Sequence, residues 1–290
     1  MEPASPSVRR YERPGSGVIA ATLFRRGWLP ESPRAAVLLA HGYAEHSGRY
    51  EHVGRWLASR GCAVHGYDHQ GHGRSDGPRG HAASLASLVD DLERLVEQVR
   101  GEHAGLPLFV LGHSMGGLVG LAYAVTRKPQ ISGLVSSAAA LEVADAVSLL
   151  SRVGLRMLRP LLPRLSMPRP ISDAALSRDP EVGRAYRADP LVFQTMTLSL
   201  AAAIYHGGAR TLAAAGNVGV PVLLLHGGDD RLVPSSGSTR FARAVTVPGS
   251  ELRIYPELRH EIFNEPEWES VLGDVLAWLG KREQGSEVKR

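Results

Sequence analysis

The 290-residue chain has little of several residue types, and each shortage excludes a class of protein. Its single cysteine, Cys62, has no partner for an internal disulfide, and its apolar neighbours predict a core residue. No run approaches the roughly 20 apolar residues that span a bilayer. The first residues also lack the basic-then-apolar pattern of a secretory signal. We therefore expect a cytoplasmic protein.

Lysine is scarce, and the positive charge is carried almost entirely by arginine. The arginines are scattered among acidic residues and do not cluster with aromatic side chains, and the net charge is only +4. The sequence therefore predicts no nucleic-acid partner. With 43% hydrophobic residues, the chain suits one large core, or one core with an insertion.

Short apolar runs alternate with helical patterns, which predicts an α/β fold. Apolar residues recur at helical spacing over 84–99 and again over 266–279. Buried strands are predicted at 37–40, 62–67, 108–111, 131–135, 220–226 and 252–255. This alternation implies a mostly parallel central sheet with helices on both faces.

The alternation stops between 139 and 210, where helical patterns and prolines occur without a convincing strand. We therefore predict a core made of 17–138 and 211–280, interrupted by a helical cap at 139–210. Residues 1–16 and 281–290 are polar and are predicted to be loose termini. A cap at this point would cover the carboxyl ends of the strands, where open α/β sheets bind ligands.

The run Gly112-His-Ser-Met-Gly116 fits the pattern Gly-x-Ser-x-Gly, between a predicted strand and a helical pattern. This context is typical of a nucleophile elbow, a sharp turn that lifts a serine hydroxyl above the sheet. The alternative is an ordinary serine in a glycine-rich turn, but the flanking strand and helix favour the elbow. The sequence therefore predicts an α/β-hydrolase fold with Ser114 as its nucleophile.

A serine hydroxyl reacts only when a base takes its proton and an acid orients that base. In this fold the three residues follow the order serine, acid, histidine. Asp229 and Asp230 follow the predicted strand at 220–226, and we assign the acid to Asp230 and a turn role to Asp229. His260 follows the strand at 252–255 and is the expected base; the alternative is a surface histidine in an acidic loop.

The oxyanion of the transition state needs two hydrogen-bond donors. The residue after the nucleophile, Met115, supplies one backbone N–H, and the loop after an earlier strand supplies the second. That loop begins at His41, which makes the N–H of Tyr43 the candidate.

Four histidines, His65, His69, His72 and His81, crowd one region of the sequence. Their spacing matches no common metal-ligand pattern, and no cysteine accompanies them. We expect structural roles for them, with no metal and no cofactor in the protein.

Several motifs together resemble the monoacylglycerol lipase family, in order from about residue 15 to 280. They are His41-Gly-Tyr-Ala-Glu-His-Ser-Gly-Arg-Tyr50, Asp68-His-Gln-Gly-His-Gly-Arg-Ser75, Gly112-His-Ser-Met-Gly-Gly117, His226-Gly-Gly-Asp-Asp-Arg-Leu-Val233 and His260-Glu-Ile-Phe-Asn-Glu265. The elbow alone indicates only an α/β-hydrolase, whereas the first and last runs together are much more specific. Lysophospholipase-like esterases share parts of both.

The resemblance implies the same triad and the same oxyanion amides, together with a polar end of the pocket that holds glycerol. The residues matching that polar end are Glu45, Arg49, His113 and Tyr186. Glu45 and Arg49 are four residues apart, so an ion pair that braces the loop is the alternative for them. The chain departs from the family at Tyr43, where a smaller residue is usual, and at Ala44, where glycine is common.

The cap contains an amphipathic pattern over 146–162. Leu150, Val153, Met157 and Leu161 share one helical face, and arginines occupy the other. Such a helix either docks at a lipid surface or packs its apolar face on the core. In the first case the same face would also line an acyl pocket, with further lining from 191–204.

These observations predict a serine esterase that cleaves monoacylglycerols through an acyl-enzyme on Ser114. A lysophospholipase or a broad carboxylesterase is the alternative, and a non-catalytic ligand-binding protein of the same fold is a third. The expected partner is a lipid ester, with transient membrane or lipid-droplet contact through the cap and peripheral location at membranes. The oligomeric state stays open.

Overall fold

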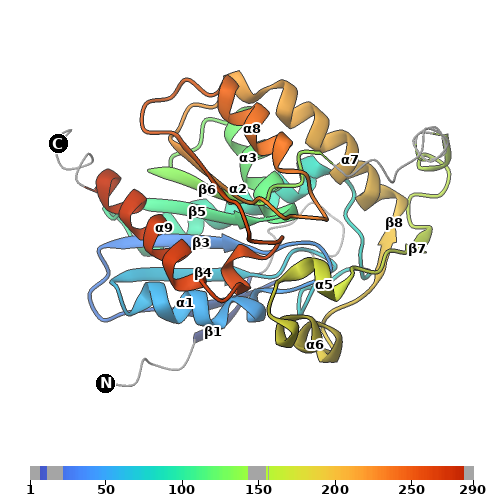
Figure 1. The fold of residues 1–290 in the computed structure, drawn as a ribbon, viewed down its shortest axis with the longest axis horizontal. Coiled ribbons are helices and arrows are strands. Elements are labelled where there is room, and N and C mark those ends of the chain that lie inside the picture. Colours follow the sequence, from blue (N-terminus) through green and yellow to red (C-terminus); the bar gives the residue numbers. More distant parts are fainter. Residues whose placement is uncertain (1–6, 12–21, 143–154, 156, 284–290) are drawn as a thin grey trace.

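A mostly parallel eight-stranded sheet forms the centre of the molecule (Figure 1). The computed structural model describes residues 7–11, 22–142, 155 and 157–283. The strand order is β1-β2-β4-β3-β5-β6-β9-β10, and only β1–β2 and β2–β4 pair antiparallel. The strands are β1 (Ser7–Tyr11), β2 (Leu23–Trp28), β3 (Ala35–Ala40), β4 (Cys62–Tyr67), β5 (Leu108–His113), β6 (Gly133–Ser137), β9 (Val222–Gly227) and β10 (Glu251–Tyr255). The predicted α/β-hydrolase fold is confirmed.

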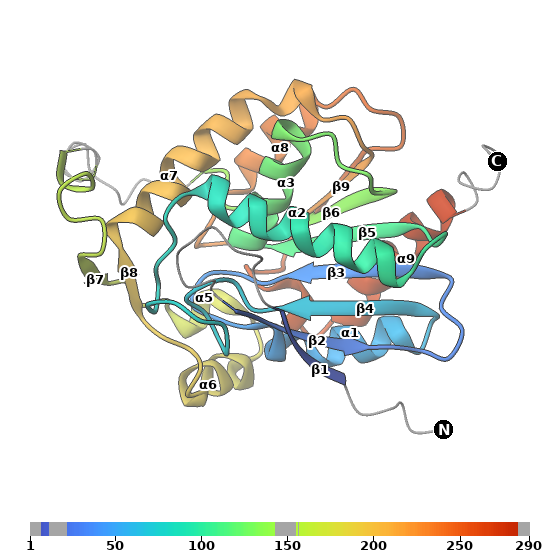
Figure 2. The same ribbon diagram turned by 180° about the vertical axis from the view of Figure 1, so that it is seen from behind.

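Helices cover both faces of the sheet because the strands are apolar on both sides. The helices α1 (Glu51–Ala58) and α9 (Trp268–Glu283) pack on one face. The other face carries α2 (Leu85–Glu102), α3 (Met115–Thr126) and α8 (Ser235–Ala244) (Figure 2). Cys62 is fully buried in the first of these two layers, as predicted, and burial raises the pKa of its thiol to about 11.

The segment between β6 and β9 lies over the carboxyl ends of the strands (Figure 1). It contains α5 (Asp173–Leu176), α6 (Pro180–Ala188) and α7 (Leu198–Ala213), with a 3-10 turn at Ala215–Asn217. The expectation that this segment has no strand is wrong, since β7 (Ser166–Pro168) and β8 (Thr195–Thr197) form a small antiparallel pair. Three-residue strands are too short to leave an alternating pattern in the sequence.

The predicted boundary at 210/211 falls inside helix α7, which packs against α2 and α3 of the core. Two glycines permit this close approach. A Cβ on Gly207 would lie 2.6 Å from the side chain of Leu85, and one on Gly208 would lie 2.6 Å from the carbonyl of Ala140. Cap and core are therefore joined here by a continuous helix.

The prediction of loose termini is wrong in part at both ends. Residues 7–11 form β1, an edge strand, and edge strands commonly carry charged residues, so composition conceals them. At the other end α9 continues to Glu283, and its basic last turn suits the negative end of the helix dipole. In the part of the chain that the structure describes, no helix is long and apolar enough to cross a membrane.

Candidate active site

Ser114 stands on a strained turn between β5 and α3. Its φ is 52° and its ψ is −112°, outside the conformations that L-residues favour, at a cost of about 1–3 kcal/mol. The turn is tight because a Cβ on Gly112 would lie 2.4 Å from the carbonyl of Gly116. A Cβ on Gly116 would in turn lie 2.1 Å from the carbonyl of Ala40. Only glycine fits both positions, which explains the Gly-x-Ser-x-Gly pattern.

His260 lies within hydrogen-bond reach of Ser114 and Asp230. Its Nε2 is 3.0 Å from the Ser114 hydroxyl oxygen, and its Nδ1 is 2.7 Å from Asp230 Oδ2. Since an ionised carboxylate only accepts, Nδ1 carries the hydrogen and Nε2 accepts from the serine. The structure thus brings together the three residues that were predicted to act together.

Asp230 is anchored by four donors. Its Oδ1 accepts the N–H groups of Leu232 (2.8 Å) and Val233 (2.9 Å). Its Oδ2 accepts from His226 Nε2 at 3.1 Å in addition to His260. Asp229, by contrast, points to the surface, where Arg231 donates to both of its oxygens. The geometry selects Asp230 over its neighbour.

Charge and burial act in opposite directions on this pair. Burial alone would raise the pKa of Asp230, but the charge of His260 and the hydrogen bonds of His226, His260 and Val233 hold it far below its usual range. Burial alone would lower the pKa of His260, but Asp230, Glu261 and Glu45 raise it above its ordinary value. The site therefore stabilises an imidazolium facing a carboxylate, the pair that forms when serine loses its proton.

The loop after β3 brings backbone amides close to Ser114. A Cβ on Gly42 would lie 3.3 Å from Ser114 Cβ, so the Gly42–Tyr43 segment touches the nucleophile. The His41 ring fixes this loop, with Nδ1 2.7 Å from the Gly42 carbonyl and Nε2 accepting from the His69 N–H at 2.9 Å. Met115 opens α3, so its N–H has no intrahelical partner.

Ala44 adopts φ 64°, the left-handed region that favours glycine. This conformation gives a physical reason for the glycine expected at this position. The Ala44 carbonyl accepts the N–H of Phe193 at 3.3 Å, and His46 Nε2 lies 2.8 Å from Asp189 Oδ2. The loop is therefore tied to the cap at two points.

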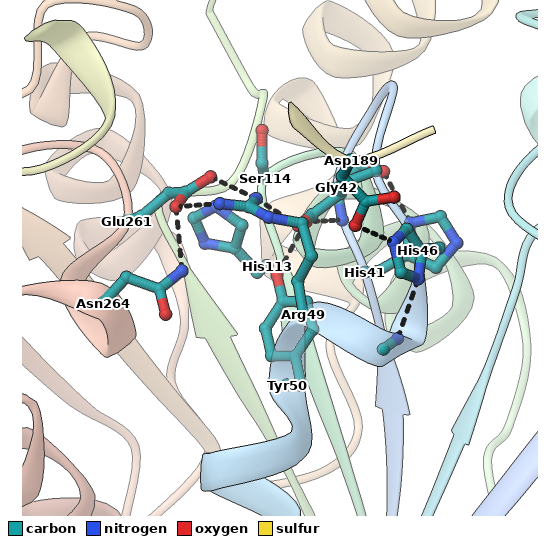
Figure 3. Close-up of polar contacts among 12 residues, drawn as sticks. His41, Gly42, His46, Arg49, Tyr50, His113, Ser114, Asp189, Glu261 and Asn264 are labelled. Carbon is teal, nitrogen blue, oxygen red and sulfur yellow. Dashed lines mark hydrogen bonds and ion pairs between the residues drawn. The ribbon is translucent and has the colours of Figure 1, made fainter. Parts of the chain in front are cut away.

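The residues predicted for the polar end of the pocket divide into two groups. Glu45, His113 and Tyr186 line the pocket, whereas Arg49 does not. Arg49 instead donates to the carboxylate of Glu261 (Figure 3). It also donates to the carboxylate of Glu45. The bracing ion pair, the alternative interpretation of Glu45 and Arg49, is present.

The pocket beside Ser114 has a volume of about 180 Å³. Cap residues form much of its wall, including Met196 and Ile204 from the predicted 191–204 stretch. The hydroxyls of Tyr43 and Tyr186 are buried without a hydrogen-bond partner among the described residues. Arg169 also lines the pocket. The cavity therefore combines apolar walls with free donors and one cation.

The predicted acyl lining from the amphipathic helix needs correction. Met157 is 67% exposed and is absent from the pocket wall. The residue of this turn that faces inward is Leu155, which packs on Leu198 and Ala202 of α7. Met157 therefore does not line the pocket, and Leu155, which is outside the predicted apolar face, is the described side chain that packs inward here. Leu150 and Val153 lie outside the described residues.

The four crowded histidines separate in space. His69 and His72 pack near His41, with ring centroids 4.6 and 5.4 Å from its own. His81 lies 3.2 Å from the hydroxyl of Thr197. His65 pairs instead with His103, with 2.8 Å between the Nε2 atoms.

Among the described residues, one group has metal-ligand spacing. Potential ligand atoms of His65, Glu102 and His103 lie within 4.8 Å of one another. The carboxylate of Glu102 already accepts two hydrogen bonds from Arg25, at 2.6 and 2.9 Å. The group sits where α2 ends, just before β5 begins, whereas Ser114 follows the carboxyl end of β5.

Sequence reasoning missed two residues that support the triad. Glu261 directly follows His260 within the motif 260–265, and this position in the motif could have indicated its role. His226 lies four residues before Asp230, and its Nδ1 is 2.8 Å from the Ser238 hydroxyl. Its spacing of four residues from Asp230 could have indicated that it supports this carboxylate.

Comparisons with known proteins identify the family of this chain. The family model described as "Serine aminopeptidase, S33" matches residues 31–267. The monoacylglycerol lipase of Mycolicibacterium smegmatis is 39% identical over 275 residues, covering 94% of this chain and 98% of its own. Human monoglyceride lipase is 32% identical, with 90% of this chain and 87% of its own covered.

Solved structures extend the likeness to three dimensions. The monoacylglycerol lipase of Paleococcus ferrophilus superposes with a TM-score of 0.83 at 32% identity, covering 90% of this chain and 99% of its own. A soluble variant of Saccharomyces cerevisiae monoglyceride lipase, in complex with a substrate analog, gives 0.87 at 25% identity, with 97% and 96% covered. The chain therefore belongs to the monoacylglycerol lipase family of α/β-hydrolases.

Proposed function

We propose that this protein hydrolyses monoacylglycerols to fatty acid and glycerol through an acyl-enzyme on Ser114. The observation that carries the proposal is the hydrogen-bonded series Ser114–His260–Asp230, with separations of 3.0 and 2.7 Å, at the wall of a pocket. The printed names of the relatives support the choice of substrate.

In the first half of the reaction, the Ser114 oxygen attacks the ester carbonyl as His260 Nε2 takes its proton. The developing oxyanion accepts the backbone N–H groups of Met115 and Tyr43, and each such donor contributes roughly 10²–10³ in rate. His260 then donates the same proton to the leaving glycerol oxygen. The acyl group stays on Ser114 as an ester.

In the second half, a water molecule takes the position that glycerol occupied. His260 accepts its proton while the hydroxide oxygen attacks the acyl carbonyl. The collapse of this second oxyanion releases the fatty acid, and the proton returns from His260 to Ser114. Asp230 stays ionised throughout and holds the imidazole in the tautomer that this sequence requires.

The polar wall would hold the glycerol. Glu45 and His113 lie beside residues 41–44 after β3, which we call the oxyanion loop. The buried hydroxyls of Tyr43 and Tyr186 have unused hydrogen-bonding capacity. Arg49 would act on the substrate only through Glu45, since it does not line the pocket. Tyr43 would give this enzyme a head-group contact that a smaller side chain at its position could not make.

The cap would dock on a lipid surface. Within the described part of the cap, six large apolar side chains are exposed, led by Leu161 at 77% and Met157 at 67%; the others are Leu158, Leu162, Leu165 and Met167. Contiguous exposed apolar groups mark interaction surfaces, and arginines nearby in the chain, such as Arg159 and Arg164, would contact anionic lipid. We accordingly propose a peripheral association with membranes or lipid droplets.

The test is a substrate panel, with monoacylglycerols of graded chain length beside di- and triacylglycerols and short p-nitrophenyl esters. We expect monoacylglycerols to give the highest kcat/KM. Ser114→Ala should lower kcat by roughly 10⁶, as removal of a triad serine does elsewhere. Retention of most ester hydrolysis by this variant would refute the mechanism. Failure of the wild type to react with a fluorophosphonate would favour a non-catalytic binding protein.

Arg169 favours lysophospholipid hydrolysis as a second candidate function. It places a cation in the pocket wall, and its charge acts on the Tyr43 phenol, where a phosphate would find two donors. Arg169→Gln should then raise KM for a lysophosphatidic acid about tenfold and leave KM for the monoacylglycerol unchanged. Arg184→Gln is the matched control, because Arg184 pairs with Glu181 on α6 and does not line the pocket. Absence of any lysophospholipid cleavage by the wild type would refute this candidate.

A further inference from the structure

A buried network of charges joins the oxyanion loop to the loop that carries His260 (Figure 3). Its centre is Arg49, in the 3-10 turn Ser47–Tyr50. Arg49 Nη1 donates to Glu45 Oε2 at 2.7 Å and to Glu261 Oε1 at 2.6 Å, and Nη2 donates to Glu261 Oε2 at 2.8 Å. One guanidinium thus bridges two carboxylates that are 216 residues apart in the sequence.

At one end of the network, Glu45 fixes the oxyanion loop. Its Oε1 accepts the N–H of Gly42 at 2.6 Å and the hydroxyl of Tyr50 at 2.7 Å. Glu45 thus holds the peptide before Gly42, and His41 holds the Gly42–Tyr43 peptide through its carbonyl, so that both residues restrain the Tyr43 N–H. Gly42 and the Glu45 carboxylate are tightly packed, because a Cβ on Gly42 would lie 2.8 Å from Glu45 Oε1.

At the other end, Glu261 fixes the His260 loop. Its backbone N–H donates to the carbonyl of Leu176 at 2.8 Å, and its Oε2 also accepts from Asn264 Nδ2 at 2.8 Å. Glu261 is 5% exposed, so solvent does little to screen its charge from the adjacent imidazole. Arg49, paired bidentately with it, is the nearest compensating cation.

The ionisable groups that face His260 are few. The charges that act on it are those of Asp230, Glu261 and Glu45, and the centroid of the His113 ring is 4.8 Å from its own. Burial holds the pKa of His113 down to about 3, so this ring is neutral at working pH. Removal of the Arg49 charge would leave the Glu261 carboxylate uncompensated beside His260, whereas burial and Glu261 already raise the pKa of Glu45.

We propose that Arg49 is a positioning residue that locks the oxyanion loop to the His260 loop and, by neutralising Glu261, sets the lower pH limit of catalysis. The proposal rests on the proposed function. His260 must be unprotonated to accept the Ser114 proton, so the acid limb of the pH–rate profile reports its pKa. An uncompensated Glu261 raises that pKa, and a neutral residue at position 261 lowers it.

The experiment measures the rate at which a fluorophosphonate labels Ser114 from pH 4.5 to 9, beside kcat and KM on a soluble short-chain ester. For Glu261→Gln we expect the acid limb to move down by about one pH unit, the order expected for one buried charge at side-chain distance. For Arg49→Gln we expect it to move up by about one unit, with kcat about 10–100-fold lower and KM within twofold, because the oxyanion loop is no longer fixed. Arg49→Lys should restore the limb but not kcat, because an ammonium keeps the charge and loses the bidentate bridge.

Arg55→Gln is the matched control, since Arg55 pairs with Glu51 on the surface of α1. It should leave both the limb and kcat unchanged. The proposal would be overturned if the acid limbs of Arg49→Gln and Glu261→Gln stayed within about 0.3 pH unit of the wild type, or if both moved in the same direction.

If Arg49→Gln does not fold, Glu261→Gln alone still decides the electrostatic part. Labelling does not depend on which lipid is the substrate, so failure of the monoacylglycerol assignment would leave this readout intact. Absence of labelling in the wild type would refute the proposed function itself, together with this proposal.

Discussion

Replacing Asp230 by asparagine should abolish catalysis through a single proton. Asp230 Oδ1 accepts two backbone N–H groups, so the asparagine must keep its oxygen at that position. Its amide nitrogen then occupies the place of Oδ2 and presents N–H to His260 Nδ1. His260 Nδ1 therefore has to accept, which moves its hydrogen to Nε2, facing Ser114. In that tautomer the histidine cannot take the serine proton.

The expected loss in kcat is about 10⁴-fold, the size seen when a triad acid is replaced by its amide in another serine hydrolase. This corresponds to about 5 kcal/mol of transition-state stabilisation. Folding should suffer less, by about 1.5–3 kcal/mol for the lost charge-assisted hydrogen bond. His226 still has a partner, because its Nε2 lies 3.1 Å from the carbonyl of Val233.

The assay compares kcat and urea unfolding for Asp230→Asn and Asp229→Asn. Asp229 is the matched control because its ion pair with Arg231 lies at the surface, where such pairs contribute about 0–1 kcal/mol. We expect Asp229→Asn to keep kcat within twofold. Retention of more than a tenth of the activity by Asp230→Asn, or a large loss in Asp229→Asn, would refute the reasoning.

Three further predictions concern pH, strain and the cap. Burial lowers the pKa of His69 to about 3, so the unfolded chain binds a proton that the native state does not. Stability should therefore be complete above pH 6.5 and fall below it by about 1.4 kcal/mol per pH unit for each such histidine; equal urea midpoints at pH 7 and 5.5 would contradict this. Ala44→Gly should stabilise by about 0.5–1 kcal/mol, the left-handed strain of alanine less the entropy cost of glycine, and a lower urea midpoint would argue against it. The double variant Met157→Ser, Leu161→Ser should lower activity several-fold on emulsified esters but not on monomeric esters. Ile254→Ser, at an exposed apolar residue of β10, is the control. Equal loss of activity on both substrates would count against docking.

The meeting of Ser114, Asp230 and His260 could be predicted because each lies within a few residues of the carboxyl end of a strand. Ser114 is marked by the glycines of a tight turn, and Asp230 and His260 follow apolar strands in the order that the fold requires. The strands β1 and β2, at one side of the sheet, could not be predicted in the same way. In β2 the buried Arg25 interrupts the apolar pattern, and its charge is compensated by Glu102, 77 residues further along.

The ion pairs of Arg49 could not be predicted from local sequence patterns for a similar reason. Arg49 and Glu261 are 212 residues apart, and only the completed parallel sheet places the carboxyl ends of β3 and β10 on the same side of the molecule. The absence of Met157 from the pocket wall could not be predicted either, because an amphipathic pattern marks an apolar face but not the element that covers it. There α7 packs against Leu155, and this contact decides which side of the turn is buried.

The two ties between the cap and the oxyanion loop set a condition for engineering. His46 Nδ1 accepts the Gly48 N–H, so its Nε2 donates to Asp189 at the end of α6. Phe193 donates to the strained Ala44 a few residues further on. A chimera that takes its cap from a relative, in search of another chain-length preference, would replace both partners and release the loop that carries the Tyr43 N–H. A graft that leaves Asp189 and the backbone of Phe193 in place should keep turnover. A graft that replaces both would change specificity and catalysis together.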